Sequence, residues 1–223
     1  IKGAFLDADK AFEVINGMRT VEVRVLLKSI NTLVLARALA AHPAINVQCS
    51  AVEGNENYAL RERLMYLGLP APLFTIDLDT EMGRRISRHA FQRFFDCLEP
   101  AFGLQVTLGQ VNTVVVCPAL TSHSELSDEA LREAGISLTT IRIAVGDEDP
   151  RSLLAHLMQA AELALEPECP GFSRHFGQPQ AIDALYESIY VDVHRRYAAS
   201  RPRMQQMLST CGPAVSRPPW PHL

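Results

Sequence analysis

The sequence predicts an α+β fold in which helices pack on one face of a small sheet. Of the 223 residues, 48% are hydrophobic and 21% are charged, a balance typical of a globular protein with a sizeable core. Apolar residues recur at three- and four-residue steps in some segments and alternate with polar residues in others. From residue 45 onward the helical and strand-like segments alternate along the chain, which favours a layered domain.

The first predicted element is a long helix over residues 9–42. Pro43 ends it, because proline disfavours helical geometry in the residue before it. A strand is then expected over Ile45–Val52, and a helix over Tyr58–Leu67 that stops at Gly68.

The clearest strand covers Leu73–Asp79, where apolar and polar residues alternate so that one face is buried. A helix from about Glu81 to Leu98 is expected after it. Val111–Cys117 is a run of β-forming residues that ends at Pro118, because proline cannot donate to a strand ladder.

Two further helices and a strand follow. Ser127 is a good N-cap for one helix, and Gly135 suits its C-terminal stop. Residues 140–145 form the last expected strand. Asp149 caps a helix that runs to about residue 165, with Pro150 at its first position.

We expect four parts in this chain. Residues 1–44 are the end of a preceding domain with a connecting helix, and residues 45–165 are the α+β domain. Residues 166–180 are rich in Pro and Gly and are predicted to be a linker. Residues 181–223 are a helical extension, with a helix over 181–197, and a Pro-rich tail. The chain begins with Ile rather than Met, so we expect a processed, truncated or excised product.

Composition and charge argue against several classes of protein. The net charge is −4 and no basic face is evident, so nucleic acid is not an expected partner. No apolar run approaches membrane-spanning length, and no signal peptide is recognisable. The five cysteines form no C-x-x-C pair, which predicts no metal site and no disulfide framework. Reduced cysteines in a cytoplasmic protein are expected.

Arg142 is the residue that most needs a chemical explanation. It lies in an apolar strand, and alternation places it on the opposite sheet face from Ile141 and Ile143. A guanidinium in that setting is costly unless it is paired. Its planar fork matches a carboxylate, which could belong to a bound ligand or to a neighbouring Asp or Glu. The strand alone leaves both alternatives open.

Several clusters stand in a recognisable order: Asn16–Thr20 (NGMRT) with Asn31, Val106–Gly109 (VTLG), Pro118–His123 (PALTSH) and Ile141–Pro150 (IRIAVGDEDP). Together they resemble the C-terminal domain of the Cys/Met-metabolism family of pyridoxal-phosphate (PLP) enzymes, which includes cystathionine synthases and lyases, methionine γ-lyase and O-acylhomoserine sulfhydrylases. The resemblance covers roughly residues 7–165. It implies the substrate-recognition part of a fold type I, aminotransferase-like PLP enzyme.

The resemblance implies that Arg142 binds the α-carboxylate of an amino-acid substrate. Thr107 stands where the family usually has serine, in a turn with Leu108 and Gly109, and it keeps a hydroxyl and a backbone N–H for a supporting role. Val106 replaces the Glu of many cystathionine lyases, which puts their substrate preference in doubt for this chain.

His123 and Glu148 have alternative interpretations. His123 could act as a general base, but the resemblance implies that it holds a loop. Glu148 and Asp149 could form an acid pair or a metal site, although a helix start also explains Asp149.

The family's reactive lysine is missing. Lys2, Lys10 and Lys28 are the only lysines, and none has the family's Ser-x-Thr-Lys setting. We therefore expect no catalytic residue within this chain, a start just downstream of that lysine, and PLP bound mainly by a missing N-terminal domain. The resemblance implies a lyase or transferase acting at the β- or γ-carbon of a sulfur-containing or O-acylated amino acid, as a homodimer or homotetramer. The alternative is a non-catalytic domain that keeps the fold for binding or assembly.

Overall fold

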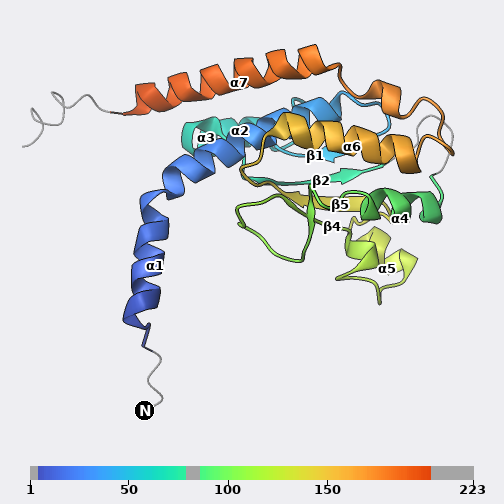
Figure 1. Cartoon of the computed structure of the whole chain (residues 1–223), viewed down its shortest axis with the longest axis horizontal. Helices are drawn as coiled ribbons and strands as arrows, with labels where there is room; N and C mark the ends of the chain where they lie inside the picture. The colour runs from blue at the N-terminus through green and yellow to red at the C-terminus, as the bar shows by residue number, and fades with distance from the viewer. Residues whose placement is uncertain (1–4, 79–85, 202–223) are drawn as a thin grey trace, which may run out of the picture.

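The computed structural model describes residues 5–78 and 86–201 of the chain, and these form an α+β fold (Figure 1). The strands are β1 (Asn46–Gln48), β2 (Leu73–Asp77), β3 (Gly103–Leu104), β4 (Val114–Val116) and β5 (Thr140–Ala144). The helices are α1 (Ala8–Arg19), α2 (Val21–Ala40), α3 (Tyr58–Leu64), α4 (Arg88–Asp96), α5 (Asp128–Glu133), α6 (Pro150–Ala164) and α7 (Pro179–Ser200), with short 3-10 turns η1 (Tyr66–Gly68), η2 (Pro118–Leu120) and η3 (Ser173–His175). The predicted fold class is confirmed.

The five strands form one mixed sheet in the order β1-β2-β5-β4-β3. The pairs β1–β2, β2–β5 and β5–β4 are antiparallel, and β3 pairs with β4 in parallel. In this register Thr75 and Val116 flank Arg142 on the neighbouring strands. Since directly paired residues share a sheet face, these three side chains stand on the same face in the middle of the sheet.

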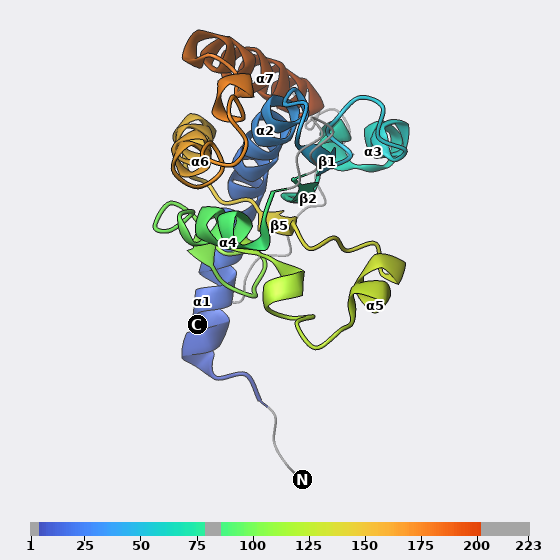
Figure 2. The ribbon, with the colours of Figure 1, turned by 90° about the vertical axis from the view of Figure 1, so that its right-hand side faces the viewer.

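One sheet face carries the main core. Apolar side chains of β2, β4 and β5 join those of α2, α4 and α6 in a single buried cluster, and they include Phe74, Ile76, Val115, Ile141 and Ile143. Burying each of these side chains is worth about 1.5–3 kcal/mol. Figure 2 shows α2 between the sheet and α7, with α6 beside it. Helices thus cover the face opposite to Arg142, as the alternation in β5 predicts.

The long helix predicted over residues 9–42 is divided in two. Thr20 has non-helical geometry (φ −111°, ψ 1°) and separates α1 from α2. The break is stabilised by Arg24, whose guanidinium donates to Gly17 O (2.7 Å) and to Thr20 Oγ1 (3.2 Å). None of the α1 residues is buried, and the helix projects from the rest of the chain (Figure 1).

Two strand predictions differ from the structure, and one strand is additional. β1 is three residues long rather than eight, because the chain turns at Cys49, whose carbonyl accepts the N–H of Val52. β4 begins at Val114 rather than at residue 111, because Thr113 N–H donates to the Glu148 carboxylate instead of a strand. The two-residue β3 was not predicted, since two residues show no periodicity. Asp79, the helix start expected at Glu81 and the Pro-rich tail lie outside the described residues. Within them α4 begins only at Arg88, because Ser87 is extended and caps the helix by accepting the Ala90 N–H.

The predicted caps are confirmed. Ser127 Oγ accepts from Ala130 N–H at the start of α5 (3.3 Å), and Gly135 adopts φ +71° after it. Asp149 caps α6 by accepting from Arg151 N–H (2.9 Å), and Pro150 is its first residue. The Arg151 guanidinium also holds the pKa of Asp149 below its usual range.

The segment between α6 and α7 packs closely against the domain. The Glu166 carboxylate accepts the N–H groups of Gly171 (2.6 Å) and Ser173 (3.0 Å), and these bonds lower the pKa of Glu166. Phe172 and Phe176 pack around the buried ring of His42, at centroid distances of 4.5 and 4.9 Å. The helix predicted over 181–197 is confirmed as α7, which lies over α2 (Figure 1). Within the described residues no helix is both long and apolar enough to cross a membrane.

His42 makes stability depend on pH. Its Nδ1 accepts Ala44 N–H (3.1 Å), so the other nitrogen, Nε2, carries the proton and donates to Phe172 O (2.9 Å). Burial lowers the pKa of His42 from its ordinary value of about 6.5. Below about pH 6.5 the unfolded chain therefore binds a proton at His42 that the folded chain does not bind. The contribution of neutral His42 to the free energy of unfolding is complete above about pH 6.5 and is lost as the pH falls below it.

We expect the free energy of unfolding, measured with urea, to decrease from pH 7.5 to pH 5.5 in the native sequence. His42→Gln should be less stable at pH 7.5 and should lose less on acidification. His89→Gln, which changes an exposed histidine of α4, is the control. An equal pH dependence in His42→Gln and the native sequence would contradict the role of His42.

Candidate functional site

Arg142 lies in the central strand β5 with part of its bonding capacity unused. Its Nη2 donates to the backbone carbonyl of Thr107 (3.2 Å). Its Nε is buried and has no hydrogen-bond partner in the structure. An unpartnered buried donor of a charged group costs on the order of 1–3 kcal/mol or more, so the guanidinium keeps bonding capacity that the described residues do not use.

The alternative of a structural salt bridge is not supported by the described residues. Within residues 5–78 and 86–201, the ion pairs do not include Arg142. Asp77, on the adjacent strand, uses its carboxylate elsewhere, because it accepts from Ser137 Oγ (2.6 Å) and from Thr140 Oγ1. Among the described residues, the guanidinium of Arg142 is therefore not paired with a carboxylate.

Thr107 is placed beside Arg142 through its backbone. Its carbonyl accepts from Arg142, and within the part of the chain that the structure describes its hydroxyl forms no hydrogen bond. Gly109 has φ +77°, a conformation that side-chain-bearing residues rarely adopt, and this explains the glycine of the turn. The Leu108 side chain points into solvent and is 57% exposed. The structure thus brings together Arg142 and the predicted Thr107–Gly109 turn.

The loop between β3 and β4, residues 105–113, is attached to the domain by polar contacts. Lys28 of α2 is buried and donates its Nζ–H to Gln110 O. Asp147 N–H donates to Val111 O (2.9 Å). The side chains of Val106 and Val111 are 66% and 57% exposed, so they contribute little packing. Hydrogen bonds to the backbone therefore fix this loop.

A second set of contacts joins this loop to the segment after β5. The Glu148 carboxylate accepts Thr113 N–H (2.6 Å) and Thr113 Oγ1–H (2.7 Å), and Gly146 N–H donates to Thr113 Oγ1 (2.9 Å). Asn31 of α2 donates Nδ2–H to Gly146 O (3.1 Å) and Glu148 O (2.8 Å). We call Asn31, Thr113, Gly146 and Glu148 the clasp. Glu148 thus connects two segments of the chain.

His123 is placed in the loop that follows η2. Its N–H donates to Pro118 O (2.9 Å), and its exposed ring bonds Ser122 Oγ through Nδ1 (2.8 Å). The structure gives it no contact with Arg142 or Thr107. Burial raises the pKa of the nearby Cys117 thiol, which keeps it protonated and unreactive. In the described parts of the chain, no three His, Cys, Asp or Glu side chains gather as metal ligands would.

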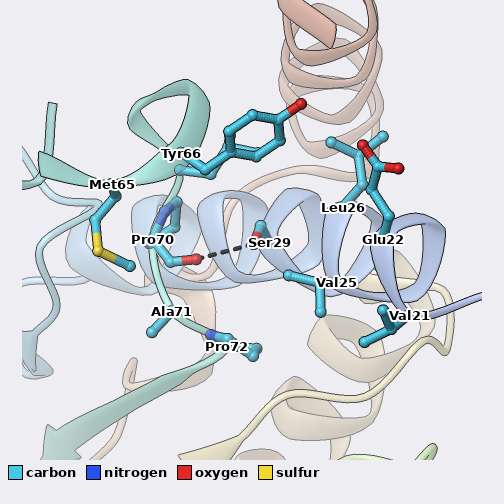
Figure 3. A pocket seen from close by; sticks show the side chains of 11 residues that line it. Val21, Glu22, Val25, Leu26, Ser29, Met65, Tyr66, Pro70, Ala71 and Pro72 are labelled. Carbon is cyan, nitrogen blue, oxygen red and sulfur yellow. Dashed lines mark hydrogen bonds between the residues drawn. The ribbon is translucent and has the colours of Figure 1, made fainter. Parts of the chain in front are cut away.

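An apolar pocket of about 360 Å³ lies between the first half of α2 and the Met65–Pro72 segment (Figure 3). Val21, Val25 and Leu26 form one wall, and the bond from Ser29 Oγ to Pro70 O (2.9 Å) closes its inner end. None of the predicted site residues lines it. Its one charged group is Glu22, so it does not suit a carboxylate.

The two described lysines already have partners. Lys10 of α1 is exposed and pairs with Glu13 (3.0 Å), and Lys28 is buried against Gln110 O. Sequence reasoning identified Arg142, Thr107 and Asn31, but it assigned no role to Lys28. The position of Lys28 among apolar residues of a helix could have indicated that it is buried.

The comparisons with known proteins show the family of this chain. The family model described as Cys/Met metabolism PLP-dependent enzyme matches residues 1–162, and the chain belongs to this family. The chain is 32% identical over 161 residues to an L-methionine γ-lyase from Pseudomonas deceptionensis and 29% identical over 154 residues to a homocysteine synthase from Schizosaccharomyces pombe. The resemblance inferred from the motifs is confirmed.

Solved structures show the same fold. A Campylobacter jejuni protein assigned as an O-acetylhomoserine (thiol)-lyase, solved with a pyridoxyl-lysine group, has a TM-score of 0.61 at 30% identity, over 72% of this chain and 36% of that one. A cystathionine γ-synthase from Xanthomonas oryzae, in complex with cystathionine, has a TM-score of 0.57 at 26% identity, over 70% of this chain and 38% of that one. The two curated relatives are matched over 72% and 69% of this chain, which spans only 38% and 34% of their length.

The clasp leaves no room for a side chain at Gly146. A Cβ there would lie 2.4 Å from Asn112 C and from Thr113 N, both of which are backbone atoms. We expect Gly146→Ala to lower the free energy of unfolding by about 2–4 kcal/mol, as overpacking of a rigid site does. Urea denaturation measures this change.

Gly17→Ala is the matched control. A Cβ at Gly17 meets only Arg24 Nη2, at 4.0 Å, and Gly17 lies inside α1. Alanine there should stabilise the helix by up to about 1 kcal/mol. If Gly146→Ala were as stable as the native protein, the backbone around the clasp could move to accommodate the added methyl group, and the clasp would not be rigid.

Proposed function

We propose that this chain forms the carboxylate-binding part of a PLP-dependent lyase or transferase. The proposed substrate is a sulfur-containing or O-acylated amino acid that reacts at its β- or γ-carbon. The observation that carries the proposal is the guanidinium of Arg142, which has a buried Nε without a partner and no ion pair among the described residues. Family membership and relatives named as γ-lyase, synthase and sulfhydrylase support it.

In this proposal Arg142 binds the substrate α-carboxylate by a bidentate, charge-assisted pair. The Thr107 carbonyl holds the guanidinium in place, and the free Thr107 hydroxyl and N–H stand beside it as further donors. Fixing the carboxylate orients the Cα–H bond, so the contribution of these residues is positioning. PLP, when bound, supplies the electron sink that this chemistry requires.

We further propose that the reactive lysine and most of the PLP site lie outside these 223 residues. Neither Lys10 nor Lys28 is a free amine, and the chain spans about a third of the length of its curated relatives. A homodimer or homotetramer and a cytoplasmic location complete the proposal. The unlinked thiols of Cys49, Cys97 and Cys117 support a reducing compartment.

Arg142→Met in the complete, PLP-loaded protein should lower kcat/KM for the amino-acid substrate about a hundredfold, because a bidentate charge-assisted pair is worth roughly 3 kcal/mol. Steady-state kinetics measure this loss. Arg132→Met is the matched control, since Arg132 of α5 is exposed and pairs only with Glu129.

A substrate analogue without the carboxylate should react equally poorly with the native and Arg142→Met proteins. If the complete native protein never acquires the visible absorbance of bound PLP, the enzyme proposal fails, and a non-catalytic binding or assembly domain is the alternative. Unchanged kinetics in Arg142→Met would overturn the role of Arg142 alone.

A further inference from the structure

One face of α2 holds both loops that border Arg142. Lys28 and Asn31 lie three residues apart, so their side chains project from the same side of the helix. Lys28 bonds the carbonyl of Gln110 in the loop before β4, and Asn31 bonds the carbonyls of Gly146 and Glu148 after β5. The helix thus sets the spacing of the two loops.

Lys28 is an unfavourable residue for the stability of this helix. Its side chain is only 5% exposed, and within the described residues it takes part in no ion pair. A buried ammonium loses much of its hydration, and one neutral carbonyl does not replace it. Replacement of such a charge by an apolar side chain of similar length is often neutral or stabilising.

The loop that Lys28 holds is the one that holds Arg142. Gln110 O accepts from Lys28, and Thr107 O, three residues earlier, accepts from Arg142 Nη2. The intervening Leu108 side chain is exposed and Gly109 has none, so packing does not fix this turn. The position of the turn therefore depends on polar contacts of the loop backbone: Thr107 O with Arg142, Gln110 O with Lys28, and Val111 O with the Asp147 N–H.

We propose that Lys28 is a positioning residue for carboxylate binding. By holding Gln110 O it fixes the 105–113 loop, and the loop in turn holds Arg142 and the Thr107 hydroxyl in the orientation that binds the substrate. This inference rests on the proposed function of Arg142. In this inference, Lys28 increases the affinity for the substrate although it lies outside the reactive centre. Its burial lowers the stability of the fold.

Lys28→Met tests this role in the complete, PLP-loaded protein, because methionine keeps most of the side-chain length and removes the charge. We expect KM for the amino-acid substrate to rise about tenfold, with kcat changed less than about twofold, since a lost positioning contact weakens ground-state and transition-state binding alike. The thermal unfolding midpoint should stay the same or rise. A lysine with a purely structural role would show the opposite pattern, a lower midpoint with an unchanged KM.

Lys10→Met is the matched control, since it removes an exposed lysine of α1 that pairs with Glu13. It should leave both KM and the midpoint unchanged. Amide hydrogen exchange gives a second measurement that is independent of activity. In Lys28→Met the amides of Gln105 and Asp147, which donate to Gly103 O and Val111 O, should exchange faster, while those of β5 should not change.

An unchanged KM in Lys28→Met, where Arg142→Met does raise KM, would overturn this inference and leave the proposed function intact. Unchanged kinetics in both variants would overturn the proposed role of Arg142 as well. A fall of more than a few degrees in the midpoint of Lys28→Met would also overturn the inference, because Lys28 would then support the fold as a whole.

Discussion

The guanidinium of Arg142 is the constraint on which the rest of this structure depends. It stands in the central strand of the sheet, on the face opposite to the main core, with a buried Nε that no atom of residues 5–78 or 86–201 satisfies. Such a charge is tolerated in a folded domain when its surroundings hold it rigidly and a ligand completes its bonding. Helix α2 holds the loops on either side of β5, and one of those loops contacts the guanidinium.

Rigidity around Arg142 comes from backbone hydrogen bonds. The clasp links the segment after β5 to the segment before β4, Asn31 ties the segment after β5 to α2, and Lys28 ties the loop before β4 to the same helix. α2 is itself enclosed between the sheet and α7 (Figure 2). The site is therefore built from loops supported by a helix that the core holds on two sides, an arrangement that gives precise placement of functional groups.

Much of the fold could be predicted from the sequence, because its signals are local. Alternation in residues 73–79 and 140–145 gave β2 and β5, and the caps Ser127 and Asp149 gave the starts of α5 and α6. The break at Thr20 could not be predicted, since it depends on a side-chain contact between Arg24 and Gly17. β3 and the start of β4 could not be predicted for a similar reason, because partners distant in the sequence determine them.

The residues of the candidate site could be predicted from the sequence, but most of the contacts that hold them in place could not. The motifs gave Arg142 and the Thr107–Gly109 turn, and alternation gave the correct sheet face for Arg142. The contacts of Lys28 with Gln110 and of Glu148 with Thr113 join residues 82 and 35 positions apart. No local pattern encodes such pairs, so the sequence alone leaves a metal site and an acid pair as alternatives for Glu148.

Helix α1 has little packing to stabilise it. It has 12 residues, none of them buried, and its Phe12, Ile15 and Met18 side chains are 63%, 52% and 66% exposed. A helix of that length is marginal in water by itself. Its population should therefore rise and fall with whatever covers those three side chains. Binding to any surface that covers them must offset the conformational entropy lost when the helix becomes ordered. The affinity per unit of buried area will therefore be lower, and the binding more easily reversed.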